Sequence, residues 1–159
     1  MSFSSDVKKE LSNVKPEKSC CARSELGGLY ASMASLNLLG RGQVNVQFSS
    51  ESLAVCRRAY TLLSQALHIA AQIHYVSSAR FGGKRKCVLT LGPIQSPVLL
   101  CALGMMEKNE DGTYSLKATT PRLPLTRGCC MRAVLRGMLL GGGTMTNPEQ
   151  GYHLEIAFR

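Results

Sequence analysis

The sequence predicts an α+β fold in which one helix–hairpin unit occurs twice, with the second copy truncated. Residues 20–36 (CCARSELGGLYASMASL) and 129–145 (CCMRAVLRGMLLGGGTM) align at a constant offset of 109, which is 129 minus 20. The identical pairs are Cys20/Cys129, Cys21/Cys130, Arg23/Arg132, Leu26/Leu135 and Gly28/Gly137. Each copy then runs through a turn into a strand of alternating apolar residues, near 44–48 and 152–158. We therefore expect the functional site to lie where the two copies meet.

A short amphipathic helix should lead into the first copy, within residues 1–19. Ser4 or Ser5 can cap its start, and Pro16 stops it.

The first repeat, residues 20–106, reads α-β-β-α-β-β-α from the changes in apolar periodicity. Its expected elements are a helix over about 20–34, a hairpin turned at 40–42, a helix capped by Ser49 or Ser50 and ending near His68, a hairpin with its tip at 80–86, and a helix from Pro93 to about Met106. In the middle helix the expected core face holds Leu53, Tyr60, Leu63 and Leu67, and the outer face holds Arg57 and Arg58.

Residues 107–126 are polar and interrupted by proline, which indicates a connection. The second repeat, 127–159, begins with a helix over about 127–142 and a hairpin turned at 147–150. It lacks the α-β-β-α remainder of the first repeat. We therefore expect a longer protein; the alternative is a short form that completes itself by pairing with another chain.

Small residues recur four positions apart in both repeated helices, as Gly28 and Ser32 in the first and Gly137 and Gly141 in the second. A glycine inside a helix costs about 1 kcal/mol relative to alanine, so a compensating contact is needed. Small residues at this spacing let two helix backbones approach closely. The pattern predicts a tight crossing between the two repeated helices.

The composition favours a polyanionic partner. The formal net charge is +9 and the pI is about 9.4, a balance typical of proteins that bind nucleic acid. The lack of tryptophan argues against a base-stacking platform. No stretch approaches the roughly 20 apolar residues of a membrane span, and the start has no signal pattern, so we expect a cytoplasmic protein without a membrane partner.

The cysteines give no recognisable ligand motif. There are seven, and none forms a C-x-x-C pair or a Cys/His cluster at zinc spacing. We interpret the adjacent pairs as small apolar residues at helix starts. No metal site and no cofactor are predicted.

At this point the residues carry a resemblance. Two helices with small residues at their crossing, each followed by a hairpin, resemble the LAGLIDADG homing-endonuclease fold. Several segments are similar to the WhiA family of bacterial transcription regulators, whose amino-terminal domain is a degenerate version of that fold. They are the opening MSFSSDVKKEL, the two CC-x-R starts, the run Leu135–Thr144 and the closing Tyr152–Ile156.

The resemblance implies a missing half-domain strand set and a carboxy-terminal helix-turn-helix. It also implies roles in cell division, chromosome segregation and, in sporulating bacteria, sporulation, together with a WhiB-like regulatory partner in some lineages. A nucleoid-associated location follows from a role on double-stranded DNA.

A nuclease of this fold needs an acid at the end of each motif helix to hold divalent metal ions. Aligning the motif on this chain places those positions at Met33 and Gly142, and neither residue supplies the oxygen ligand that a hard cation prefers. The nearest acid, Glu25, lies at the opposite end of its helix. The sequence therefore predicts a non-catalytic protein with no catalytic residue and no small-molecule substrate.

What remains is binding. In this fold the hairpins form a saddle over duplex DNA, so basic hairpin turns should contact phosphates. The predicted contact residues are Arg41, Arg80, Lys84, Arg85 and Lys86. The alternatives are a solvated basic loop and, for the whole module, a scaffold whose saddle binds a protein partner rather than DNA. Asn45 and Gln47, on a polar strand face, could meet base edges.

Overall fold

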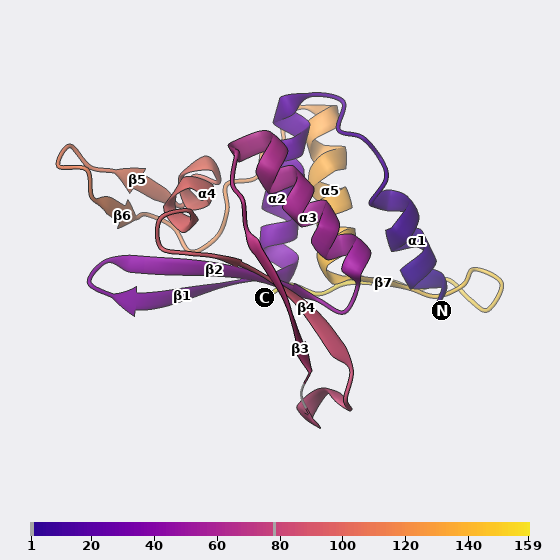
Figure 1. Ribbon diagram of the computed structural model, residues 1–159. Coiled ribbons are helices and arrows are strands. Elements are labelled where there is room, and N and C mark those ends of the chain that lie inside the picture. Colours follow the sequence, from indigo (N-terminus) through magenta and orange to yellow (C-terminus); the bar gives the residue numbers. More distant parts are fainter. Residues whose placement is uncertain (1, 78) are drawn as a thin grey trace.

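The computed structural model describes residues 2–77 and 79–159, and its three longest helices stand on one side of a four-stranded sheet (Figure 1). The helices are α1 (Phe3–Leu11), α2 (Ser19–Met33), α3 (Leu53–Leu67), α4 (Ser96–Ala102) and α5 (Gly128–Gly142). The main sheet contains β1 (Ala34–Gly40), β2 (Gln43–Ser50), β3 (Gln72–Ser77) and β4 (Arg85–Leu91), with a 3-10 turn η1 (Ala79–Phe81) between the last two. Two short hairpins pair β5 (Met106–Lys108) with β6 (Tyr114–Leu116) and β7 (Gly143–Met145) with β8 (Leu154–Ile156). The predicted α+β class is confirmed.

The serines that cap the starts of α1 and α3 are not the predicted ones. The hydroxyl of Ser2 caps α1 by accepting the backbone N–H of Ser5 at 3.2 Å. Ser4, a predicted cap, instead accepts the N–H of Met145 at 3.3 Å and so ties α1 to β7. In α3 the cap is Ser52, because β2 continues through the two serines expected to cap that helix.

The segment from Pro93 to the second repeat also differs from the prediction. Helix α4 is shorter than expected: Pro97 lies in its first turn, Pro93 precedes it, and Met106 already belongs to β5. The predicted connection contains most of the β5–β6 hairpin, which turns at Gly112 with a φ of 86°. Glycine adopts this left-handed conformation without steric cost.

The main sheet is two hairpins joined by a short ladder. Its strand order is β1-β2-β4-β3, and β2 pairs with β4 only over Val46–Ser50 and Cys87–Leu91. Both strands start at their own hairpin turns and run antiparallel. The two hairpins therefore project away from each other on either side of the shared ladder (Figure 1).

The two faces of this sheet differ in polarity. Val46, Phe48 and Leu89 alternate toward the helices and are fully buried. The strand register sets polar side chains beside one another on the opposite face, in the row Ser35, Gln47, Thr90 and Gln72. Strand β3 extends past the helices and is exposed along its whole length.

Helices α2 and α5 pack backbone against backbone. A β-carbon on Gly28 would collide with the carbonyl oxygen of Val134 and lie 3.1 Å from the Cα of Gly137. A β-carbon on Gly141 would collide with the hydroxyl of Ser32, which donates to the carbonyl of Gly28 at 2.8 Å. The structure thus places all four predicted packing residues at one crossing. Gly28 meets Gly137, and Ser32, one turn later, meets Gly141, one turn later in the other helix. The two helices α2 and α5 are therefore parallel.

A buried carboxylate joins the helices beside this crossing. Glu25 is fully buried on α2 and accepts hydrogen bonds from Arg58 Nε at 2.7 Å and Arg136 Nη1 at 3.0 Å. Arg58 also donates to the carbonyl of Ser12 at 3.1 Å, so this network reaches the end of α1. Buried charges are tolerated only when they are paired and hydrogen-bonded, as here.

The prediction that Arg58 lies on the outer face of α3 was therefore wrong, and so was the core position of Tyr60. Arg58 is 8% exposed because Glu25 compensates its charge, whereas Tyr60 is 37% exposed. Neighbouring Arg57 does face solvent, as predicted.

Substituting Gly28→Ala should destabilise the chain by about 1–3 kcal/mol, because the new methyl group collides with backbone that cannot move aside. The matched control is Gly27→Ala. Its methyl group would meet the ends of two flexible side chains, Leu123 at 3.0 Å and Leu103 at 3.8 Å, and the helix gains up to about 1 kcal/mol from alanine. Urea unfolding followed by circular dichroism measures both; equal free energies of unfolding would contradict the close crossing.

Substituting Arg58→Ala should lower the free energy of unfolding by about 3 kcal/mol, because it removes one partner from a buried ion pair. Arg57→Ala, one residue away and exposed, should change it by no more than about 0.5 kcal/mol. The same urea titration checks this pair. A loss below about 1 kcal/mol at Arg58 would show that the network does not hold the helices together.

Candidate nucleic-acid interface

The predicted basic residues occupy two separate hairpin tips. Arg80 lies in η1, Lys84 follows in the turn, and Arg85 and Lys86 open β4, so these four come together at the tip of the β3–β4 hairpin. Arg41 lies alone on the turn of the other hairpin, which projects elsewhere (Figure 1). The structure therefore gathers four of the five predicted contact residues.

Local backbone geometry shapes both tips. Gly82 and Gly83 have φ values of 64° and 77°, which let the chain reverse between η1 and β4. Arg41 itself has a φ of 54°, in the left-handed region that non-glycine residues rarely enter. Glycines on both sides, Gly40 and Gly42, complete this turn with φ values of 83° and 74°.

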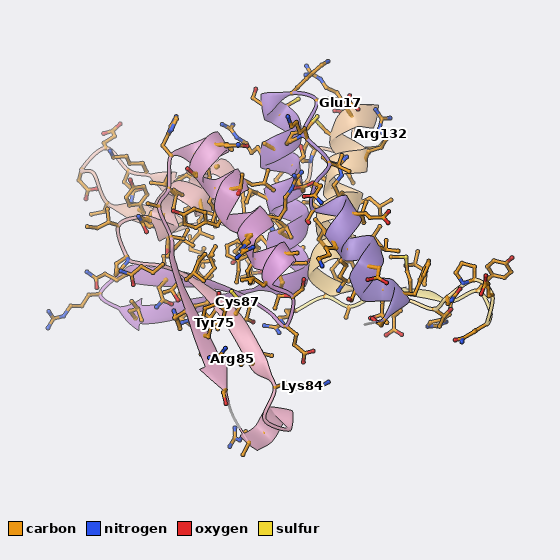
Figure 2. The ribbon with its side chains drawn as sticks, turned by 45° about the vertical axis from the view of Figure 1, so that its right-hand side comes forward. Glu17, Tyr75, Lys84, Arg85, Cys87 and Arg132 are labelled. Carbon is orange, nitrogen blue, oxygen red and sulfur yellow. The ribbon has the colours of Figure 1, made fainter. Side chains whose placement is uncertain are left out.

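The four clustered cations are not equivalent. The guanidinium of Arg85 lies 5.7 Å from the centre of the Tyr75 ring, a cation–π contact that holds it along the hairpin. Figure 2 shows Arg85 beside Tyr75, whereas Lys84 points away from the hairpin. Alternation along β4 places Lys86 on the polar face of the sheet. Arg80 and Lys84 are exposed.

The polar face next to this tip has hydrogen-bonding capacity to spare. The side-chain oxygens of Asn45 and Thr90 are covered, yet they have no hydrogen-bond partner among the described residues. Strands β1 to β4 contain no acidic residue, so this face repels no anion through side chains of its own strands. An anionic ligand suits this lack of acidic side chains.

The positions that correspond to the acids of a LAGLIDADG nuclease are closed. Met33 is 1% exposed at the end of α2. A β-carbon on Gly142 would collide with the carbonyl oxygen of Ala157, so this position has no room for a side chain. Glu25, eight residues earlier on α2, is paired with Arg58 of α3 and Arg136 of α5.

Sequence reasoning missed one cluster. The sulfur atoms of Cys20, Cys21, Cys129 and Cys130 all lie within 4.8 Å of one another, at the starts of α2 and α5. Burial raises the pKa of the Cys21 thiol to about 11, whereas the hydroxyl of Ser24 lowers the pKa of Cys130. Neither pair shows metal-ligand spacing by itself. The repeat offset, combined with parallel packing, was the signal that could have found the cluster.

Comparison with known proteins identifies the family. Residues 19–95 match a model of the WhiA N-terminal LAGLIDADG-like domain, and residues 131–159 match a model of the WhiA LAGLIDADG-like domain. A relative from Alkaliphilus metalliredigens, named "Probable cell division protein WhiA", is 34% identical over 98% of this chain. A relative of the same name from Heliobacterium modesticaldum is 33% identical over 98% of this chain. The chain belongs to the WhiA family.

Solved WhiA structures share this fold. A crystal structure of a WhiA N-terminal LAGLIDADG domain aligns with a TM-score of 0.67 and 26% identity, covering 98% of this chain and 65% of that one. The full-length WhiA from Thermatoga maritima aligns with a TM-score of 0.64 and 25% identity, covering 98% of this chain and 44% of that one. The predicted LAGLIDADG-like fold is confirmed.

The chain spans about half the length of the curated WhiA relatives, 49% and 48% of the two named above. The comparisons establish the family and its fold. Within the described residues, no helix is both long enough and apolar enough to cross a membrane.

Proposed function

We propose that this chain is a non-catalytic DNA-binding part of a WhiA-type transcription regulator that acts in cell division. It lies on double-stranded DNA through the polar face of the main sheet and the tip of the β3–β4 hairpin. The chain supplies affinity and positions a separate DNA-reading domain. Roles in chromosome segregation and sporulation, a WhiB-like partner and a cytoplasmic location at the nucleoid belong to the same proposal.

The observation that carries this proposal is the clustering of Arg80, Lys84, Arg85 and Lys86 beside a sheet face without acidic residues. Cations that contact phosphates release counterions from the duplex, which gives affinity without reading the sequence. Arg85 alternates with Lys86 along β4 and therefore stacks on Tyr75 on the opposite face, so it would reach a phosphate only around the edge of the hairpin tip.

The polar sheet face supplies a second kind of contact. Asn45 and Gln47 alternate outward on β2, and Thr90 lies opposite Gln47 on β4. Amides and hydroxyls of this kind can exchange hydrogen bonds with base edges or sugar-phosphate oxygens. The oxygens of Asn45 and Thr90 are covered in the free chain, so they would gain partners from DNA only if these side chains turned outward.

The absence of catalysis is part of the proposal. Two-metal cleavage needs carboxylates that hold both ions near the scissile phosphate. In this chain the motif positions are Met33 and Gly142, and Glu25, eight residues before Met33, is paired with arginines. A protein built this way binds the duplex and leaves it intact.

The double variant Arg80→Ala/Lys84→Ala should weaken binding to any duplex sequence and reduce the salt dependence. Each lost phosphate contact lowers the slope of log affinity against log salt by about 0.9, so the slope should fall by up to about 2. Fluorescence anisotropy with a labelled duplex across a salt series measures both quantities.

The charge-matched control is Lys15→Ala/Lys18→Ala, which removes the same charge from exposed residues just before α2, at the end of that helix away from the sheet. It should leave the slope unchanged. If both double variants bind like the parent chain, the proposed contact surface is wrong. A protein partner on the saddle would then be the better hypothesis.

A supercoiled plasmid incubated with this chain and Mg²⁺ should remain supercoiled, because neither motif position offers a metal ligand. Agarose electrophoresis separates supercoiled, nicked and linear forms. The control is the same reaction with chelator. Nicking that follows the protein through purification and disappears with chelator would contradict the non-catalytic assignment.

A further inference from the structure

The starts of α2 and α5 meet at the end of the helix pair away from the main sheet. Figure 2 marks this end by Glu17 and Arg132, an exposed ion pair with its atoms 3.6 Å apart. Among the described residues, Cys20, Cys21, Cys129 and Cys130 form the one group of three or more His, Cys, Asp or Glu side chains close enough to share an ion. We propose that these four cysteines bind a single thiophilic divalent cation, and that Zn²⁺ is the ion that suits them best.

The sulfur spacing matches one tetrahedral ion. Zinc–sulfur bonds of about 2.3 Å in a tetrahedron set the sulfur atoms roughly 3.8 Å apart. The four sulfurs here lie within 4.8 Å of one another, so shifts of about 1 Å bring them to that geometry. An iron–sulfur cubane holds its cysteines farther apart, because an iron–sulfide core stands between them. A single ion therefore fits this cluster better than a cubane.

The helix starts carry an unusual charge pattern that a metal–thiolate centre explains. The N-cap residues are Lys18 in α2 and Arg127 in α5, and neither helix has a capping side chain or an acid in its first turn. Cations at the positive end of a helix are unfavourable, and Ser, Thr, Asp or Asn normally occupies this position. Both copies of the repeat share this pattern at the same register. Four thiolates around a divalent ion carry a net negative charge, which two helix starts and two cations would stabilise.

The site has partial cover and an entry path. Cys21 and Cys130 are buried, whereas Cys20 and Cys129 are half-buried. A cavity of about 450 Å³ reaches the cluster and has Cys20, Cys130 and Arg127 in its wall. An ion can enter from this cavity past Cys20 and Cys130, and Cys21, which is buried and not in the cavity wall, helps to enclose it. Entry and enclosure are both requirements of a structural metal site.

Binding is a ligand exchange without a redox step. The hydrated ion loses water, four thiols lose their protons to solvent, and four metal–sulfur bonds form. The product links residues 109 positions apart, across the two repeats. The ion thus cross-links α2 and α5 at one end of the helix pair, while the glycine crossing holds the middle.

Cobalt reports on this geometry directly. The reduced, metal-free chain should take up one equivalent of Co²⁺ and develop the intense visible absorption of tetrahedral cobalt thiolate. Zn²⁺ should then displace the cobalt and abolish this absorption. With Zn²⁺ bound, the half-buried Cys20 and Cys129 should be protected from a thiol reagent, and a chelator should restore their reaction, whereas the half-buried Cys101 should react in both cases.

Single variants test which cysteines bind the ion. Cys20→Ser and Cys129→Ser should each weaken apparent cobalt affinity by at least about 100-fold, the upper end of the loss produced by outer-shell changes. The matched control is Cys101→Ser, a half-buried cysteine in α4 outside the cluster, which should bind cobalt like the parent chain. Circular dichroism of the metal-free variants checks that each is folded.

The outcomes are distinct. One equivalent of cobalt with a tetrathiolate spectrum, lost in Cys20→Ser and Cys129→Ser but kept in Cys101→Ser, supports the site. Unchanged binding in the cluster variants, or an octahedral spectrum, overturns it. Mass spectrometry of the parent chain, purified from cells with its thiols blocked, gives an independent measurement. Disulfides between the two cysteine pairs, in place of bound zinc, would also overturn the proposal.

Discussion

The contact between the backbones of α2 and α5 is the constraint on which the rest of this structure depends. Glycine at positions 28 and 137 leaves no side chain between the helices, so their peptide groups approach to van der Waals distance. Such an approach fixes the relative rotation and height of the two repeats far more tightly than a layer of flexible side chains would. The hairpin that follows each helix then leaves at a defined position.

The crossing also explains why polar chemistry can lie inside this helix cluster. Glu25 is fully buried, which is tolerable because α3 and α5 each bring an arginine to it. These arginines reach it only while the helices keep their close spacing. Packing of small residues and pairing of charges are therefore one cooperative unit, and neither should persist if the other is removed.

Local patterns predicted much of this fold. Both repeated helices lie within one or two residues of their expected bounds, because the internal repeat reported on both segments at once. The burial of Val44, Val46 and Phe48 followed from simple alternation. Elements supported by only one weak signal fared worse: Ser49 or Ser50 was the predicted cap of α3, whereas Ser52 caps it.

The misplaced residues depend on partners that are distant in sequence. The charge of Arg58 favours a solvent face, although the residue lies three positions after Val55 and four before Leu62, both fully buried. A carboxylate 33 positions away makes its burial possible. The cysteine cluster likewise has no local spacing motif, because its two halves come from different repeats. The basic hairpin tip needed no distant partner, so its four residues could be grouped from their order alone. Apolar periodicity informs only on the helix or strand that contains a residue. The partners of Arg58 and of the paired cysteines lie in other elements.

The Glu25 network has a consequence for how the two halves recognise each other. At the offset of 109, Glu25 occupies the position of Val134, and Arg136 occupies that of Gly27. Two first repeats placed together would set the carboxylate against glycine, and two second repeats would set the guanidinium against valine. Only the mixed pair joins acid to base. The two copies are thus unlike halves, each complementary to the other and mismatched to itself, which disfavours the pairing of like repeats from neighbouring chains.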